Sequence, residues 1–93
     1  MERTKSPIQD QCWVDVFEAD YFMGRMRRLV GPRKLRQLSA KSVIVGPQAM
    51  VVLTVRRRGR DSLVTLHPRK VIPDLTATVR GAKIRNATVV LKK

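Results

Sequence analysis

Three residues at a fixed spacing place the strongest constraint on how this chain can fold. Gly24 comes seven residues after Phe17, and Ser42, which opens a short apolar run, comes eighteen residues after Gly24. Glycine adopts a positive φ more readily than other residues, so a glycine between two apolar segments indicates the tip of a tight hairpin. The spacing predicts a strand, a hairpin folded over at the glycine, and a later strand whose serine closes the turn.

This pattern resembles the Greek-key motif of the βγ-crystallin family, and the likeness is good over residues 12–55. The resemblance implies that Phe17 occupies an aromatic corner and that Gly24 takes the strained position of the hairpin. It also implies that the Ser42 hydroxyl ties the hairpin back to the sheet. Together with Gly59 in the second half, these residues form the expected fold motif.

The resemblance further implies an all-β fold, in which two Greek-key motifs form one βγ-crystallin-like β-sandwich of about eight strands. The first unit is expected at about 12–48 and the second at about 49–93, so the domain spans 12–93. Residues 1–11 are polar and contain a proline, and we expect them to form a flexible N-terminal arm.

The second half departs from the motif at two positions. Seven residues before Gly59 stands Val52 instead of an aromatic residue, and Asn86 stands where a serine is expected. The segment 73–75 does match the connecting segment of the family. The second half is therefore either a degenerate Greek key, which we expect, or a β-unit of a different kind.

Short apolar segments separated by turn residues run through the chain, as is typical of a sandwich. Helical periodicity is poor, and residues 32–40, which show some helical spacing, are expected to form a short connection. In the first hairpin, Tyr21, Phe22 and Met23 are expected to pack against the sheet. The expected strands are 12–17, 25–30, 42–45, 50–55, 63–66 and 87–91. The expected core residues are Val14, Val16, Met26, Val43, Val45, Val52, Leu53, Val64, Leu66, Val89 and Leu91.

The composition fits one folded domain, because 43% of the 93 residues are hydrophobic. No apolar run approaches the ~20 residues that span a bilayer, and no signal peptide is visible. The sequence indicates no particular compartment. Cys12 is the single cysteine, so an internal disulfide is impossible, and we expect it to be a small buried hydrophobic residue.

The formal net charge of +13 is unevenly distributed. Residues 1–20 hold two bases and five acids, whereas residues 21–93 hold eighteen bases and two acids. Such a field attracts nucleic acid, acidic glycans or anionic membrane surfaces. Scattered basic residues also keep a small domain soluble, so the net charge has this second interpretation.

A cluster of arginines at an expected hairpin tip is the clearest candidate binding site. Guanidinium groups suit phosphates and sulfates, so the cluster predicts a polyanion-binding module for nucleic acid or an acidic glycan. The few aromatic residues lie at one end of the chain, which argues against a platform for stacking bases. The four residues are Arg56, Arg57, Arg58 and Arg60.

Many βγ-crystallins bind calcium through loops that pair two Asn or Asp residues with a later Ser or Thr, and calcium prefers oxygen ligands. In the first matching loop Gln37 replaces an acidic residue, and Lys41 stands where a hydroxyl is expected. Arg85 takes the same place in the second loop. The resemblance therefore implies degenerate metal sites and no cofactor. Weak calcium binding through Glu18 and backbone carbonyls stays open.

Nothing in the sequence supports catalysis. His67 is the only histidine, so a histidine-based metal cluster is impossible, and no motif accompanies a Cys12–His67 pair. Asp61 and Asp74 lie in turn-like segments, where aspartate serves the backbone. We expect that the protein is not an enzyme.

The leading hypothesis is a non-enzymatic structural or stress-type βγ-crystallin-like protein with degenerate calcium-binding loops. The alternative is the polyanion-binding module, and an inhibitor or toxin domain is a third possibility that rests on fold analogy alone. The sequence does not identify a partner, and it is compatible with a monomer or a weak homodimer.

Overall fold

A computed structural model describes residues 11–92, and this part of the chain contains eight strands and two short helices. Valine-rich segments form the longest strands, because β-branched side chains suit a pleated surface. The helices are the 3-10 turn η1 (Asp20–Phe22) and α2 (Leu75–Thr78). The strands are β1 (Trp13–Phe17), β2 (Met26–Val30), β3 (Arg33–Leu35), β4 (Ser42–Val45), β5 (Ala49–Arg57), β6 (Arg60–Leu66), β7 (Val71–Ile72) and β8 (Lys83–Leu91).

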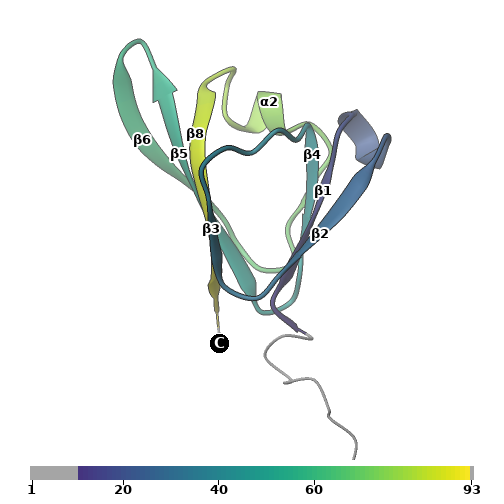
Figure 1. The fold of residues 1–93 in the computed structure, drawn as a ribbon. Coiled ribbons are helices and arrows are strands. Elements are labelled where there is room, and N and C mark those ends of the chain that lie inside the picture. Colours follow the sequence, from purple (N-terminus) through teal and green to yellow (C-terminus); the bar gives the residue numbers. More distant parts are fainter. Residues whose placement is uncertain (1–10, 93) are drawn as a thin grey trace, which may run out of the picture.

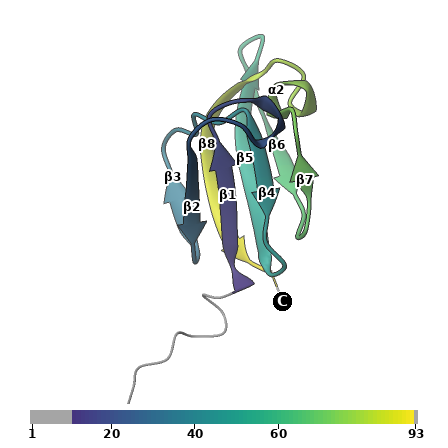
Figure 2. The same cartoon turned by 90° about the vertical axis from the view of Figure 1, so that its right-hand side faces the viewer.

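The strands form two four-stranded antiparallel sheets with the orders β2-β1-β4-β7 and β3-β8-β5-β6. Figure 1 looks between the two sheets, and Figure 2 shows the first sheet face-on with the second behind it. The side chains that fill the space between the sheets form the hydrophobic core. The expected all-β sandwich is therefore confirmed.

The two halves of the chain exchange one strand each. Three strands of the first half lie in one sheet, while β3 pairs with β8 of the second half. In the same way, β7 of the second half pairs with β4 of the first. The boundary near residue 48 stays a prediction, and the expected flexible arm at 1–11 lies outside the described residues except for Gln11.

Strand β5 shows how alternation builds the core. Its buried side chains recur at every second position, because successive residues of a strand point to opposite faces. Val52 lies between two buried positions and is half-buried on the outer face, so its expected place in the core is wrong. The buried residues of β5 are Ala49, Val51, Leu53 and Val55.

Met26 is the second error in the expected core. It pairs with Phe17 across β1 and β2, on the outer face of the first sheet, and it is 48% exposed. Val64 and Leu91 are half-buried and pack against the core. The other expected core residues are buried: Val14, Val16, Val43, Val45, Leu53, Leu66 and Val89.

Two short strands have no counterpart among the expected segments. The connection expected at 32–40 contains β3, and β7 consists of two residues beside β4. Each is too short to show an alternating pattern, so only its pairing with a longer strand identifies it. None of the helices in residues 11–92 has the length and hydrophobicity that crossing a bilayer requires.

Candidate functional site

The first hairpin folds over its sheet and is tied down by Ser42. The Ser42 hydroxyl donates a hydrogen bond to the carbonyl oxygen of Ala19 at 2.6 Å and accepts one from the backbone N–H of Phe22 at 2.9 Å. Ser42 is fully buried, so both bonds are shielded from water. The backbone N–H of Tyr21 also donates to the carbonyl of Pro73 at 2.9 Å, which joins the hairpin to the second half.

The tip of this hairpin concentrates unusual backbone conformations. Tyr21, Phe22 and Gly24 all have positive φ, at 57°, 62° and 78°. A Cβ on Gly24 would lie 3.3 Å from the backbone nitrogen of Ala19, so both the conformation and the available space favour glycine. The rings of Phe17 and Phe22 meet edge-to-face with centroids 5.5 Å apart. This contact forms the corner between strand and hairpin.

Two other residues of the hairpin do not pack as expected. Tyr21 is 69% exposed and Met23 is 64% exposed, so their expected burial against the sheet is wrong. The reason lies in the backbone: the left-handed turn directs Phe22 toward Phe17, while its neighbours are left outside. The pair therefore forms an exposed apolar tip beside the folded hairpin.

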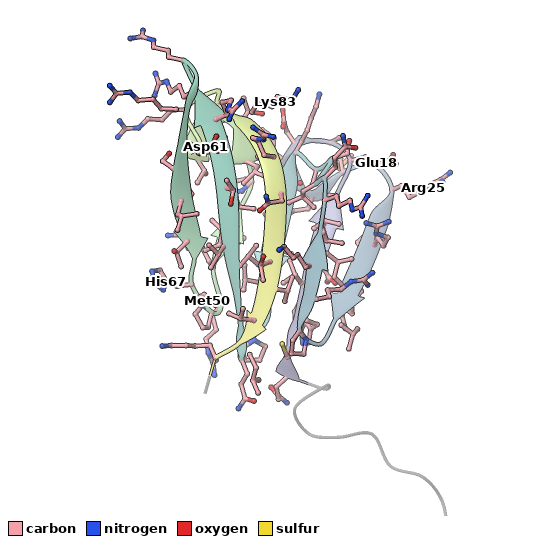
Figure 3. The ribbon with its side chains drawn as sticks, turned by 60° about the vertical axis from the view of Figure 1, so that its left-hand side comes forward. Glu18, Arg25, Met50, Asp61, His67 and Lys83 are labelled. Carbon is pink, nitrogen blue, oxygen red and sulfur yellow. The ribbon has the colours of Figure 1, made fainter. Side chains whose placement is uncertain are left out.

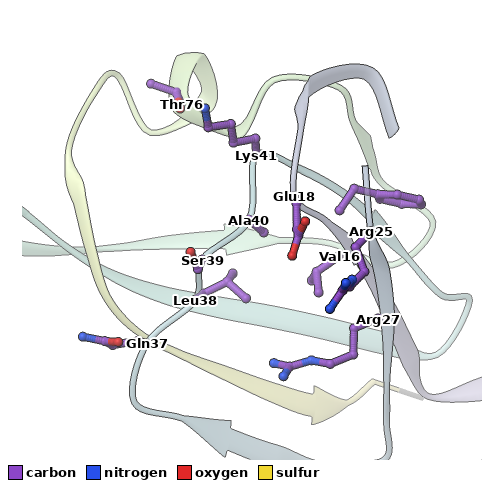
Figure 4. A pocket seen from close by; sticks show the side chains of 11 residues that line it. Val16, Glu18, Arg25, Arg27, Gln37, Leu38, Ser39, Ala40, Lys41 and Thr76 are labelled. Atoms are coloured by element: carbon purple, nitrogen blue, oxygen red, sulfur yellow. The ribbon is translucent and has the colours of Figure 1, made fainter. Parts of the chain in front are cut away.

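The first predicted calcium loop lines an open cleft of about 760 Å³. Gln37 and Lys41 come from the connection between β3 and β4, and Glu18, Arg25 and Arg27 come from the β1–β2 hairpin (Figure 4). The cleft therefore holds one carboxylate among three cations. The loop and Glu18 do share one cleft, as the sequence hypothesis requires.

The second predicted calcium loop lines another cleft, of about 600 Å³, which shares Gln37 with the first. Its lining is still more basic than that of the first cleft and contains no carboxylate. Arg85, which stands where a hydroxyl ligand is expected, is part of it. The lining residues are Arg36, Gln37, Arg56, Lys83, Ile84 and Arg85.

The donor atoms in these clefts do not fit a calcium ion. Calcium takes six to eight oxygen ligands, and a carboxylate supplies the charge that holds it. In the first cleft Glu18 offers the single carboxylate, beside the cations Arg25, Arg27 and Lys41. Across residues 11–92, no three His, Cys, Asp or Glu side chains come together as a metal site.

The predicted arginine cluster lies at the end of the β5–β6 hairpin. Arg57 and Arg60 pair across the ladder, and the two residues between them form the turn. The tip is exposed, and long side chains ending in nitrogen spread from it into solvent (Figure 3). Arg56 differs from the other three because its guanidinium binds Asp61, at 2.9 Å from Nε to Oδ1. The cluster therefore does not act as four equivalent cations.

Comparison with solved structures identifies the architecture. One similar structure comes from work on the evolution of the eye-lens βγ-crystallin domain fold; the TM-score is 0.70 at 17% identity, over 99% of this chain and 96% of that one. Another is a βγ-crystallin domain of the Abundant Perithecial Protein from Neurospora crassa in its Ca2+-bound form, with TM-score 0.70 and 16% identity over 95% of this chain and 98% of that one. This chain has the βγ-crystallin fold. No protein-family model matches the sequence, and a search of curated proteins also found no match.

Within the βγ-crystallin fold, the two residues of the Cys12–His67 pair differ in exposure. Cys12 is buried in the core and His67 is exposed, and burial raises the pKa of the Cys12 thiol, which disfavours the reactive thiolate. Asp74 caps α2 by accepting a hydrogen bond from the N–H of Ala77 at 3.1 Å. Asp61 lies in β6 and pairs with Arg56, so its expected role in serving the turn backbone is wrong.

The sequence does not predict one group of interacting side chains on the outer face of the first sheet, which consists of Trp13, Asp15 and Arg28. The guanidinium of Arg28 binds both carboxylate oxygens of Asp15, at 2.7 Å and 2.9 Å, and lies 4.1 Å from the ring centroid of Trp13. The bond to Asp15 raises the pKa of Arg28. The register of β1 with β2 creates this group, and that register only becomes known with the structure.

Proposed function

We propose that this chain is a non-enzymatic structural or stress-type domain of the βγ-crystallin fold, with two degenerate calcium loops. Its role is to form a stable sandwich without a bound metal. The observation that supports this most strongly is the gathering of cations at both loops. Lys41 lies in the first cleft with Arg25 and Arg27, and Arg85 lies in the second with Lys83.

Electrostatics supplies the physical reason. A tethered ammonium or guanidinium repels a divalent cation, and it also provides the positive charge that such a loop otherwise takes from the metal. The acidic residues that calcium loops use are absent at the matching positions, where Gln37 and Leu38 open the first loop. The related domain from Neurospora crassa was solved in its Ca2+-bound form. We propose that this chain does not bind calcium at the matching loops.

The alternative function, a polyanion-binding hairpin, gains no support from the related structures. Arg57, Arg58 and Arg60 are exposed, and Arg56 is engaged by Asp61. Exposed arginines at a hairpin tip also keep a basic domain soluble. The alternative stays a prediction.

Calorimetric titration with calcium tests the proposal. The wild-type domain is expected to give no binding heat, and the variant Gln37→Asp/Lys41→Ser is expected to gain affinity. Leu38 is left unchanged because it packs against the core. The control Gln11→Asp/Lys70→Ser makes the same change in charge at exposed positions that line neither cleft. Submillimolar binding by the wild type would refute the proposal, and equal gains in both variants would show that net charge alone controls binding.

A further inference from the structure

The second cleft collects cations from two strands and from the segment that follows a third. Arg36 follows β3, Arg56 lies near the end of β5, and Lys83 and Arg85 come from β8. Gln37 and Ile84 complete the lining. All four cationic residues are exposed, so a ligand can reach them from solvent.

The backbone explains why these cations meet. Arg56 and Lys83 stand directly opposite each other in the β5–β8 ladder, and like charges in this position repel. Just beyond them the register shifts: Val55 pairs with Ile84, whereas Thr54 pairs with Asn86. Arg85 is the extra residue of this bulge, and bulges redirect side chains. The chain thus adds a third cation at a place where two already repel.

One carboxylate stands beside the cleft. Asp61 pairs with Arg56 across β5 and β6, with Oδ1 2.9 Å from Nε and Oδ2 3.5 Å from Nη2 of the arginine. Figure 3 shows Asp61 and Lys83 at the same end of the sheet. The pKa of Asp61 is lowered mainly by the hydrogen bond from Arg56 and also by the charge of Arg85. A single carboxylate leaves the cleft with excess positive charge.

We propose that this cleft binds a multivalent phosphate anion through Arg36, Arg56, Lys83 and Arg85. Guanidinium forks match phosphate oxygens in pairs, and a lysine ammonium adds a point charge. The volume of about 600 Å³ has room for a short chain of phosphoryl groups. Such a chain occurs in inorganic polyphosphate and in nucleoside triphosphates, and the common feature is the phosphate chain.

The probe is sodium tripolyphosphate, titrated into the full chain at about 0.15 M salt, where distant charges are screened. Calorimetry is expected to show saturable binding, and amide resonances of β8 are expected to shift. The variant Lys83→Gln/Arg85→Gln is expected to lose about tenfold or more in affinity, because charge-assisted bonds are lost. The control Arg57→Gln/Arg58→Gln removes the same charge at the neighbouring hairpin tip and is expected to lose less than about threefold.

Two further variants sharpen this result. Arg36 lies outside the strand ladders, so Arg36→Gln is expected to weaken binding without affecting the fold. It replaces Lys83→Gln/Arg85→Gln if the double variant melts at a lower temperature than the wild type. Asp61→Asn removes the anion that competes for Arg56 and is expected to raise affinity about threefold. A loss of affinity in Asp61→Asn contradicts the proposal.

A second ligand separates the two sources of the anion. ATP that binds as well as tripolyphosphate supports recognition of the phosphate chain alone. The proposal is overturned if ATP binds and tripolyphosphate does not, if binding is unsaturable up to about 10 mM, or if the cleft variant and the hairpin-tip control lose affinity equally.

Discussion

The two long hairpins of this domain occupy equivalent places in the fold but are held in different ways. The first folds over its sheet and is fixed by the buried hydroxyl of Ser42. The second, β5–β6, runs straight to a two-residue turn at Arg58 and Gly59, with φ of 53° and 77°. Two positive φ values are typical of a type I′ turn, which matches the natural twist of paired strands. The turn of the first hairpin is therefore held by a long-range contact, whereas the turn of the second fits its local sequence.

The ion pairs of the two hairpins repeat this contrast. The Asp15 side chain is only 10% exposed and is covered by Arg28, which also lies over Trp13. Arg56 and Asp61 are each 46% exposed. The first pair satisfies a carboxylate in a shielded place, whereas the second lies in solvent, where water and salt weaken it.

The largest expected effect comes from replacing the two hairpin glycines. Gly24→Val is expected to lower the free energy of unfolding by about 3 kcal/mol, because it adds a steric clash to an unfavourable positive φ. Gly59→Val has open space around it and is expected to cost about 1–2 kcal/mol from the backbone alone. Urea titration of both variants measures the difference. Equal losses would remove the steric distinction between the hairpins.

The next effect concerns the serine that ties the first hairpin. Ser42→Ala leaves the Phe22 N–H and the Ala19 carbonyl without their partner, and we expect a loss of about 2 kcal/mol. Asn86→Ala, at the matching place in the second half, is expected to change stability by less than about 0.5 kcal/mol. The same urea assay applies. If Asn86→Ala costs as much as Ser42→Ala, the second half contains a tie like that of the first.

Breaking one ion pair in each hairpin has a smaller effect. Arg28→Ala leaves the shielded carboxylate of Asp15 unpaired and removes the contact with Trp13, and we expect a loss of about 1.5 kcal/mol. Arg56→Ala is expected to cost less than about 1 kcal/mol. Thermal melts of both variants measure these losses. Repeating the melts in about 1 M salt adds a check, because salt should reduce the loss of stability only for Arg56→Ala. A salt-sensitive Arg28→Ala contradicts the shielding of Asp15.

The smallest effect is a pH dependence at the second hairpin. Arg56 lowers the pKa of Asp61 in the folded state, so the pair stabilises the fold above the ordinary carboxyl pKa. That contribution is lost as the pH falls through the lowered pKa, below about 4. Wild type and Asp61→Asn should therefore converge in melting temperature as the pH is lowered from 6 toward 2. A constant difference across this range rules out the ion pair as its cause.

The sequence predicts the fold best at residues whose type permits only one structural role. Gly24 and Ser42 indicate the first hairpin and its closing strand, and alternating valines indicate most of the core. Val52 and Met26 lie on the outer face instead of in the core, because apolar residues occupy both faces of their strands and hydrophobicity alone does not separate the faces. Tyr21 and Met23 are exposed for a local reason, the left-handed turn, which hydrophobicity does not encode.

The candidate sites depend more heavily on pairing between distant segments. The second cleft needs β3, β5 and β8 to meet, and it needs the bulge that isolates Arg85. In the sequence, Gly46 and Pro47 indicate only the end of a strand, yet a Cβ on Gly46 would lie 2.7 Å from the carbonyl oxygen of Trp13. Such close approaches appear only once the strands are in register.

A thermal melt in EDTA and then in excess calcium tests the central claim most directly. We expect the two melting temperatures to agree, because both loops carry cations in place of metal ligands. A functional site filled at about 100 times its dissociation constant would add about 2.7 kcal/mol of stability, and the melting temperature of a domain of this size would rise by about 10 °C or more. A rise of that size would contradict a metal-independent domain and would identify calcium-linked stability as its function.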